Sequence, residues 1–256
     1  MFAMGKFSGI LLCSDVDGTL TYESGKISQK NKEAIDYFIS EGGAFTIASG
    51  RYPKFIMDLG VKTSAPILSF NGSLIFDAET GKAIEEGFLP ATAFPVIKFI
   101  SQKFSDKIAA VRVYAKDNCD IPPERSLSYL NGEHDIYKAV FVTENEENAI
   151  IIRDFASELT AISSLPVEVR RSWPTGVEMI NIDSNKGNAC LYLKNYLGAH
   201  TLVTVGDFEN DISMLKVADL SFATENASDE IKKYAKKIAP RNTEDAIAYV
   251  INELSK

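Results

Sequence analysis

The chain has 256 residues, of which 45% are hydrophobic and 24% are charged, and its formal net charge is -8. This length and composition are typical of a globular protein with one large domain or two smaller ones. The acidic balance argues against binding along a nucleic-acid backbone, which requires a clustered basic surface.

The cysteines and the first apolar run exclude several classes of protein. Cys13, Cys119 and Cys190 are widely separated and form no C-x-x-C pair, so they predict neither a disulfide framework nor a zinc site. The apolar run at residues 10–13 is too short for a signal peptide or a membrane span. We therefore expect a cytoplasmic protein that does not bind membranes, as a monomer or a small homo-oligomer.

The first third of the chain alternates short apolar runs with a helical pattern. Strands are expected at residues 7–14, 44–48 and 66–70. A helix is expected after Ser28, a candidate N-cap, and it ends at Gly42 and Gly43. This alternation predicts a parallel sheet wrapped by helices.

The middle of the chain has a different pattern, with strands and helices in α+β order. A hairpin is expected at residues 73–88 and a polar, proline-containing loop at 117–124. The expected helices are 92–104 and 146–159, and the expected strands are 108–114, 137–143, 167–171 and 177–182. A second module of about 100 residues is within the normal size of a domain.

The doubly wound pattern returns after residue 183. A helix is expected at 187–196, a strand at 202–205, a helix through Met214 and Leu215, a strand at 220–223 and helices from there onward. The predicted fold class is therefore α/β, a doubly wound parallel-sheet core with an inserted α+β domain. The predicted core comprises residues 1–81 and 184–256, and the inserted domain comprises residues 82–183.

The first motif is Asp15-Val16-Asp17-Gly18-Thr19, directly after the first strand. Two carboxylates separated by one residue favour a divalent cation, because hard cations prefer oxygen ligands. An EF-hand is excluded, since its terminal glutamate would fall at Lys26 and a strand precedes the motif. An ordinary strand-end loop remains the alternative for this motif alone.

The second acidic motif runs from Gly206 to Asp211 and follows the strand at 202–205. Its three carboxylates lie within five residues and repel one another, a cost that a bound cation removes. An acid-rich helix N-terminus is the alternative reading.

Two further motifs could hold a phosphate group. Ser49-Gly50-Arg51 offers a hydroxyl and backbone N–H groups at a strand-to-helix turn, although an ordinary turn has the same composition. Lys186 opens a helix against the helix dipole, which gives no helix stability, although a solvated lysine could also lie there. Because ligands of open parallel sheets bind at the carboxyl ends of the strands, we expect all four motifs to form one site.

The combination of these four motifs, in this order, resembles the haloacid dehalogenase-like phosphatases. The long insert resembles the α/β cap of the Cof-type sugar-phosphatase subgroup. The segments Ser69-Phe70-Asn71-Gly72 and Glu178-Met179-Ile180-Asn181 also lie where that subgroup has similar segments. The resemblance covers nearly the whole chain.

The resemblance implies roles for the acidic residues. Asp15 is expected to be the nucleophile, and Asp17 the general acid and base. A Mg²⁺ cofactor is expected to be held by Asp15, the main-chain carbonyl of Asp17 and Asp207, while Asp211 orients metal-bound water.

The resemblance also implies how the substrate is bound. Ser49, Gly50, Lys186 and Asn210 are expected to bind the phosphate oxygens of a small phosphate ester such as a sugar phosphate. The inserted domain is expected to cover the site, exclude water and supply specificity, with Glu178 and Arg171 as candidate contacts.

Two alternatives use the same phospho-aspartate chemistry. A phosphomutase would return the phosphoryl group to its substrate. A phosphorylation-dependent signalling module is shorter than this chain and needs no acid at the position of Asp17. P-loop and dinucleotide-binding sites are excluded, because neither G-x-x-x-x-G-K-[ST] nor G-x-G-x-x-G occurs.

Overall fold

The computed structural model describes residues 5–23 and 25–256, which divide into two compact units. The first unit comprises residues up to Ile84 and from Lys186 onward, and the second comprises Glu85–Asn185. The first unit is therefore built from two stretches of chain, one on each side of the second unit.

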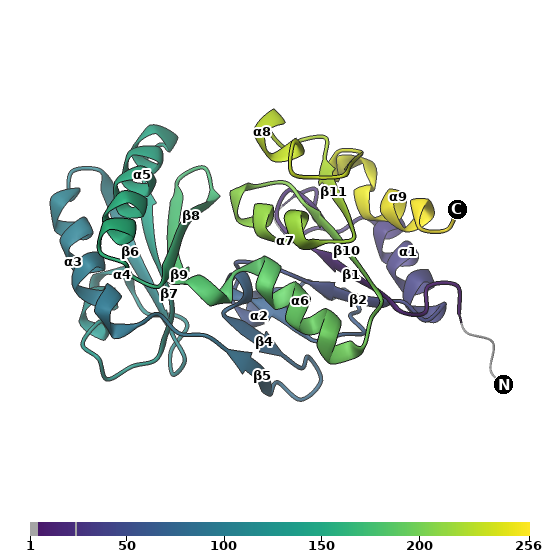
Figure 1. Ribbon diagram of the computed structural model, residues 1–256, viewed down its shortest axis with the longest axis horizontal. Helices are drawn as coiled ribbons and strands as arrows, with labels where there is room; N and C mark the ends of the chain where they lie inside the picture. Colours follow the sequence, from purple (N-terminus) through teal and green to yellow (C-terminus); the bar gives the residue numbers. More distant parts are fainter. Residues whose placement is uncertain (1–4, 24) are drawn as a thin grey trace. The chain divides into compact units, whose positions relative to one another are not determined.

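A five-stranded parallel sheet forms the centre of the first unit (Figure 1). Its strand order is β12-β11-β10-β1-β2, and each neighbouring pair is parallel. The strands are β1 (Ile10–Ser14), β2 (Ala44–Ile47), β10 (Thr201–Gly206), β11 (Leu220–Thr224) and β12 (Lys237–Ala239). Because β1 lies between β10 and β2, segments far apart in the sequence end side by side at one edge of the sheet.

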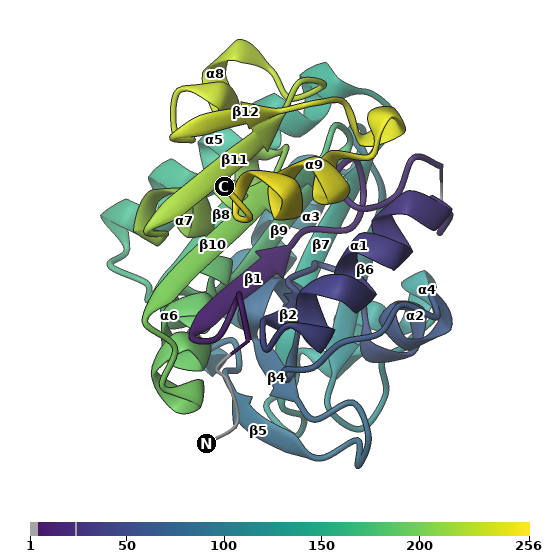
Figure 2. The same ribbon diagram turned by 90° about the vertical axis from the view of Figure 1, so that its right-hand side faces the viewer.

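Helices from both ends of the chain cover this sheet. Helices α1 (Gln29–Ser40) and α9 (Ala246–Glu253) pack on each other, as Figure 2 shows, and α6 (Lys186–Leu197) packs on α7 (Ile212–Val217). The shorter helices of this unit are α2 (Pro53–Asp58) and α8 (Asp229–Lys232). Burial of apolar surface on both faces, at about 25 cal/mol per Å², explains why the central strands β1 and β10 are largely apolar and buried.

The strand β1 illustrates how alternation sets the packing. Leu11 and Cys13 are fully buried and pack in one cluster with Cys190 and Leu193 of α6. Because successive side chains of a strand point to opposite faces, Leu12 is directed to the other face, where it is also fully buried. A strand buried on both faces fixes the position of the acidic residues that follow it.

A small second sheet contains the strand expected at residues 66–70. The strands β3 (Ile67–Ser69), β4 (Leu74–Phe76) and β5 (Ala83–Glu86) follow in this order across the sheet, and β3 pairs antiparallel with β4. Among the described residues, one isolated parallel bridge, between Ala48 and Leu68, extends β3 toward the end of β2. The third expected core strand therefore does not belong to the five-stranded sheet.

The second unit is an antiparallel sheet with helices packed on one face. The sheet order is β6-β7-β9-β8, with β6 (Ile108–Ala115), β7 (Ile136–Thr143), β8 (Val167–Trp173) and β9 (Gly176–Asn181). Helices α3 (Phe94–Lys103) and α5 (Glu146–Ile162) share a buried apolar cluster with the sheet, and α4 (Pro123–Ser126) is one turn long. This unit therefore has a hydrophobic core of its own.

Two expectations about secondary structure were wrong. Residues after Ala223 were expected to be helical, but β12 pairs with β11 at the edge of the sheet. The loop expected at 117–124 runs into the short helix α4 at Pro123. Across residues 5–23 and 25–256, no helix combines the length and the apolar character needed to cross a membrane.

Candidate active site

The carboxyl ends of three adjacent strands define the candidate site. Asp15 follows β1, Ser49 lies just beyond β2 and Asp207 follows β10. The backbone N–H of Asp15 donates to the carbonyl of Val205 over 2.9 Å, which continues the pairing of β1 with β10 up to the site. The sheet therefore brings these distant segments together, as open parallel sheets do.

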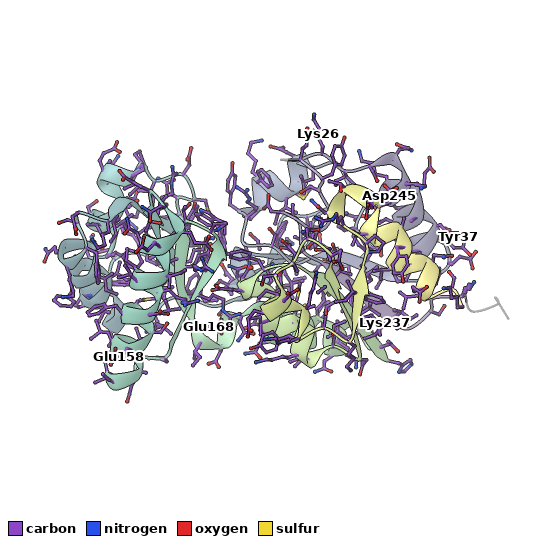
Figure 3. All side chains as sticks on the ribbon, turned by 90° about the horizontal axis from the view of Figure 1, so that it is seen from above. Lys26, Tyr37, Glu158, Glu168, Lys237 and Asp245 are labelled. Carbon is purple, nitrogen blue, oxygen red and sulfur yellow. The ribbon has the colours of Figure 1, made fainter. Side chains whose placement is uncertain are left out.

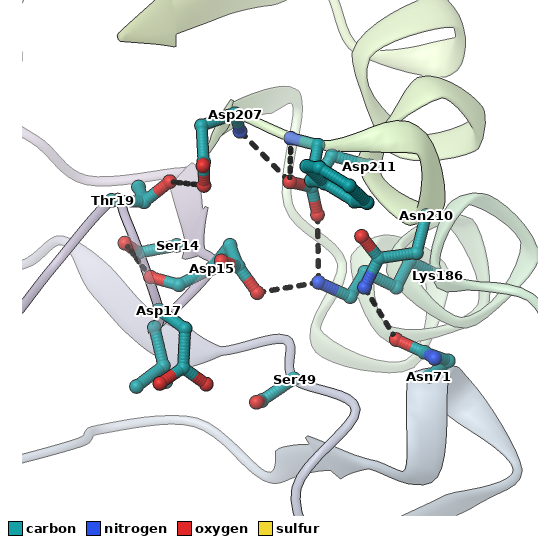
Figure 4. A network of polar contacts seen from close by, with 12 residues as sticks. Ser14, Asp15, Asp17, Thr19, Ser49, Asn71, Lys186, Asp207, Asn210 and Asp211 are labelled. Atoms are coloured by element: carbon teal, nitrogen blue, oxygen red, sulfur yellow. Dashed lines mark hydrogen bonds and ion pairs between the residues drawn. The ribbon is translucent and has the colours of Figure 1, made fainter. Parts of the chain in front are cut away.

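Lys186 joins two of the acidic motifs. It is the first residue of α6 and has no exposed surface. Its Nζ lies 2.5 Å from Oδ1 of Asp15 and 2.7 Å from Oδ1 of Asp211 (Figure 4). A buried charge is tolerated when it is paired in this way.

The loop after β10 is held by its own last residue. Oδ2 of Asp211 accepts hydrogen bonds from the backbone N–H groups of Asp207 and Phe208, over 2.8 and 3.0 Å. The hydroxyl of Thr19 donates to Oδ1 of Asp207 over 2.7 Å. The carboxylate of Asp211 therefore binds two backbone N–H groups and Lys186. The carboxylate of Asp207 is oriented by Thr19 of the first motif.

Gly18 is required where the first motif meets this loop. Its φ is +81°, which L side chains rarely adopt. A Cβ placed there would lie 2.3 Å from Oδ2 of Asp207. Only glycine lets the backbone pass this close to the carboxylate.

The site has an unbalanced negative charge. Burial, and then the charge of Asp211, raise the pKa of Asp15 well above its usual value, although Lys186 opposes this. Burial and Asp211 likewise raise the pKa of Asp207 to about 7. Burial alone would lower the pKa of Lys186, but Asp15 and Asp211 outweigh it and the pKa is raised.

These residues fit a divalent cation. Oxygen atoms of Asp15, Asp207 and Asp211 all lie within 4.8 Å of one another. One lysine faces three carboxylates, which leaves two negative charges when all are ionised. A cation with two positive charges and a preference for oxygen ligands balances them.

Asp17 is placed differently from the other acids. Its side chain is 43% exposed and is held by Arg51, whose Nε and Nη2 donate to Oδ2 and Oδ1 over 2.8 and 3.0 Å. The guanidinium of Arg51 also lies 4.6 Å from the ring centre of Phe55. Nothing in the sequence alone pairs Arg51 with Asp17.

The predicted phosphate-binding residues also lie in this region. Ser49 is buried, and its Oγ accepts a hydrogen bond from the backbone N–H of Arg51 over 3.2 Å. Asn210 is buried, and its Nδ2 donates to Oδ1 of Asn71 over 3.0 Å. Asn71 had no predicted role, although its segment, Ser69 to Gly72, resembles one in the Cof-type subgroup and its Asn-Gly pair follows a strand.

The two candidate specificity residues lie in the second unit, on opposite faces of its sheet. Arg171 is paired with Val177, which belongs to the apolar cluster, and its Nη1 contacts Glu146 over 2.7 Å. Glu178 is the next residue after Val177, so it points to the other face. There its Oε1 lies 2.6 Å from Nζ of Lys138, and both side chains are nearly fully buried.

This arrangement of acids, lysine and strand ends is matched by a known family. The sequence profile of the haloacid dehalogenase-like hydrolases matches residues 12–251. The chain belongs to this family. The matched range includes all the residues of the candidate site.

Two relatives of this hydrolase are named as phosphatases. YwtE and YcsE of Bacillus subtilis (strain 168) are each named a 5-amino-6-(5-phospho-D-ribitylamino)uracil phosphatase. YwtE is 26% identical over 276 residues, covering 94% of this chain and 96% of YwtE. YcsE is 28% identical over 245 residues, covering 94% of each chain.

The solved structure of a HAD subclass IIB sugar phosphatase has the same fold. Its TM-score is 0.75 at 18% identity, covering 95% of this chain and 98% of that one. The predictions of the family, of an α/β fold and of an enzyme of the phosphatase class are therefore confirmed.

Proposed function

We propose that this hydrolase is a Mg²⁺-dependent phosphatase of small phosphate monoesters that forms an aspartyl-phosphate on Asp15. The observation that carries the proposal is the buried bridge of Lys186 between Asp15 and Asp211, with Asp207 beside it. Lys186 holds the Asp15 carboxylate by one oxygen, Oδ1, and so restrains the direction of the other.

In the first step, an oxygen of Asp15 forms a bond to phosphorus while the ester P–O bond breaks. Asp17 gives its proton to the leaving oxygen, which departs as an alcohol. In the second step, water attacks phosphorus, Asp17 takes a proton from it, and the bond between phosphorus and Asp15 breaks. Inorganic phosphate leaves and both carboxyl groups return to their starting states.

The transferred phosphoryl group needs donors for its equatorial oxygens. Ser49, the backbone N–H of Gly50, Asn210 and Lys186 are the donors that we assign to it. Groups fixed in advance in this way stabilise developing charge without reorganising during the reaction. The half-exposed side chain of Asp17 is accessible to the leaving group and to water.

Asp15, Asp207 and the main-chain carbonyl of Asp17 would hold the Mg²⁺ ion. When bound, Mg²⁺ supplies positive charge that offsets repulsion between the phosphate ester and the carboxylates. Asp211 would keep the loop of Asp207 in place through its two backbone hydrogen bonds.

The substrate class is inferred from the relatives. YwtE and YcsE are named for a phosphorylated ribityl compound, and the fold is shared with a sugar phosphatase. We infer a phosphorylated sugar, polyol or similar metabolite, with residues 82–183 acting as the cap that selects it. Glu178 and Arg171 as specificity residues, a cytoplasmic location and a monomer or small homo-oligomer stay predictions.

Release of inorganic phosphate from a panel of phosphorylated sugars and polyols tests the proposal. We expect release that requires Mg²⁺ and is stopped by a chelator. Asp15→Asn is expected to lower kcat by at least about a thousandfold, because the nucleophile is removed while the shape is kept. Asp58→Asn, an exposed position on α2, is the matched control and keeps full activity.

Three outcomes would contradict the proposal. Full activity of Asp15→Asn would remove the nucleophile, and unchanged rates in excess chelator would remove the metal. Transfer of phosphate back to the substrate only in the presence of a bisphosphate activator would indicate a phosphomutase instead.

A further inference from the structure

A strained turn lies directly beside the phosphate-binding residues. Phe70, Asn71 and Gly72 follow β3 and have φ values of 51, 59 and 99°. Three successive residues in the left-handed region are uncommon, and only Gly and Asn adopt it readily. Such conformations persist where the surrounding structure holds them.

Hydrogen bonds tie this turn to the loop that follows β2. The backbone N–H of Asn71 donates to the carbonyl of Ser49 over 2.9 Å. The hydroxyl of Ser69 and the backbone N–H of Phe70 both donate to the carbonyl of Arg51, over 2.7 and 3.2 Å. These hydrogen bonds therefore hold the loop of Ser49 and Gly50 against β3 and the turn that follows it.

The side chain of Asn71 extends this link to the loop after β10. Its Oδ1 accepts from Nδ2 of Asn210, and both residues are at least nine-tenths buried. Its amide also lies against Gly50, where a Cβ would be 3.1 Å from Nδ2 of Asn71. Figure 4 shows Asn71 meeting Asn210 in the same region as Lys186 and Ser49.

We propose that Asn71 is a positioning residue for the phosphate-binding site, which acts through Asn210 and Gly50. By accepting one of the two N–H groups of Asn210, it fixes the plane and direction of that amide. The close packing against Gly50 leaves little room for a Cβ there, so the Asn71 amide restrains the backbone of Gly50. The inference rests on the proposed function, because that proposal assigns phosphate binding to Asn210 and Gly50.

The conformation of Asn71 allows a clean substitution. Asn71→Gly keeps the left-handed backbone without strain and deletes only the amide. An alanine there would add backbone strain to the loss of the amide and would confuse the two effects. Asp245, labelled in Figure 3, has the same φ of 59° at the start of α9, and its Oδ1 accepts from Ser28. Asp245→Gly is therefore the matched control.

The test is a double-mutant cycle of Asn71→Gly and Asn210→Ala. Binding of inorganic phosphate and of orthovanadate is measured by calorimetry in the presence of Mg²⁺, together with kcat and KM. Asn71→Gly is expected to weaken binding of both anions about tenfold, the effect of losing one oriented hydrogen bond. The same substitution in the Asn210→Ala background is expected to have a clearly smaller effect.

The inference is overturned if Asn71→Gly leaves anion binding unchanged, or weakens it equally in both backgrounds. It is also overturned if Asp245→Gly weakens binding as much, or if the unaltered protein binds neither anion. If Asn71 and Asn210 are coupled but Asp15→Asn is fully active, this inference stands and the proposed nucleophile is rejected. If the enzyme is active but Asn71→Gly has no effect, the proposed function stands and this inference is rejected.

Discussion

Lys186 shows how one residue can be unfavourable locally and favourable in the site. At the first position of α6, its positive charge opposes the helix dipole, and its side chain is completely removed from water. Its ion pairs with Asp15 and Asp211 offset both costs. A buried lysine at this position needs carboxylates beside it to pair with its charge. The excess of carboxylates over lysine then favours the binding of a cation.

The pKa of Asp207 predicts a link between pH and Mg²⁺ binding. Burial and the charge of Asp211 raise the pKa of Asp207 to about 7, above the value of about 3.9 in an unfolded chain. A raised carboxyl pKa stabilises the fold at low pH, and this contribution is lost as the pH rises through about 7. Bound Mg²⁺ favours the ionised form, so we expect it to raise Tm more at about pH 8 than at about pH 5.

Thermal unfolding with saturating Mg²⁺ and with a chelator, at both pH values, measures this link. Asp207→Asn is the control, since it removes the titrating group and should abolish most of the gain. An equal rise in Tm at the two pH values would contradict the predicted link between the protonation of Asp207 and Mg²⁺ binding.

At this scale, the sequence predicts residues that carry their chemistry in a local motif. Asp15, Ser49, Lys186 and Asp207 were all found because each directly follows a strand or opens a helix. The parallel strand order brings Asp15 and Asp207 close together, and Lys186 pairs with Asp15.

The sequence does not predict partners that meet only through tertiary structure. Arg51 meets Asp17, and Asn71 meets Asn210, across separations of 34 and 139 residues. An Asn-Gly pair reports a turn but not the residue that its side chain will reach.

At the scale of elements, N-cap residues determine where helices begin. The side chain of Asn145 accepts from the backbone N–H of Asn148 over 2.9 Å and caps α5, the longest helix of the second unit. Asn145→Ala is expected to lower the free energy of unfolding by about 0.5–2 kcal/mol, and Asn145→Gly by only a few tenths. Urea unfolding followed by fluorescence of Trp173, the one tryptophan of the chain, measures both.

The comparison of the two variants separates the causes. Glycine is a tolerated cap that leaves the first helical N–H groups accessible to water, whereas alanine is not. Equal losses in the two variants would mean that the asparagine side chain contributes through contacts other than the cap.

The elements that could be predicted are those with a strong local period. The helix expected at 146–159 is α5, and the strand expected at 202–205 lies within β10. β12 was missed because it has three residues, Lys237 to Ala239, too few to show the alternating pattern of a strand. Its strand conformation comes from pairing with β11, which is a long-range interaction that the local pattern does not contain.

At the scale of the whole molecule, the proposed catalytic and phosphate-binding residues all lie in the first unit. Two stretches of chain build this unit, and the second unit, Glu85–Asn185, is inserted between them in the sequence. Within the second unit, a Cβ on Gly87 would lie 1.8 Å from Oγ of Ser184, and Nδ2 of Asn181 donates to the carbonyl of Phe88. The outgoing and returning segments are therefore adjacent.

This adjacency predicts that the chemistry and the selectivity can be separated. Since each extended residue spans about 3.3–3.6 Å, a linker of about three glycine and serine residues can replace 88–183. Because each unit has its own apolar core, we expect the shortened chain to fold and to bind orthovanadate with Mg²⁺.

We expect kcat/KM for the preferred sugar phosphate to fall at least about tenfold, because positioning of the substrate is lost. Its activity toward p-nitrophenyl phosphate should fall less, since an activated aryl ester depends least on contacts beyond the phosphate. A shortened chain that keeps the full ranking of substrates would show that the first unit alone sets specificity, and one that folds but no longer binds vanadate would show that the phosphate site needs residues from the second.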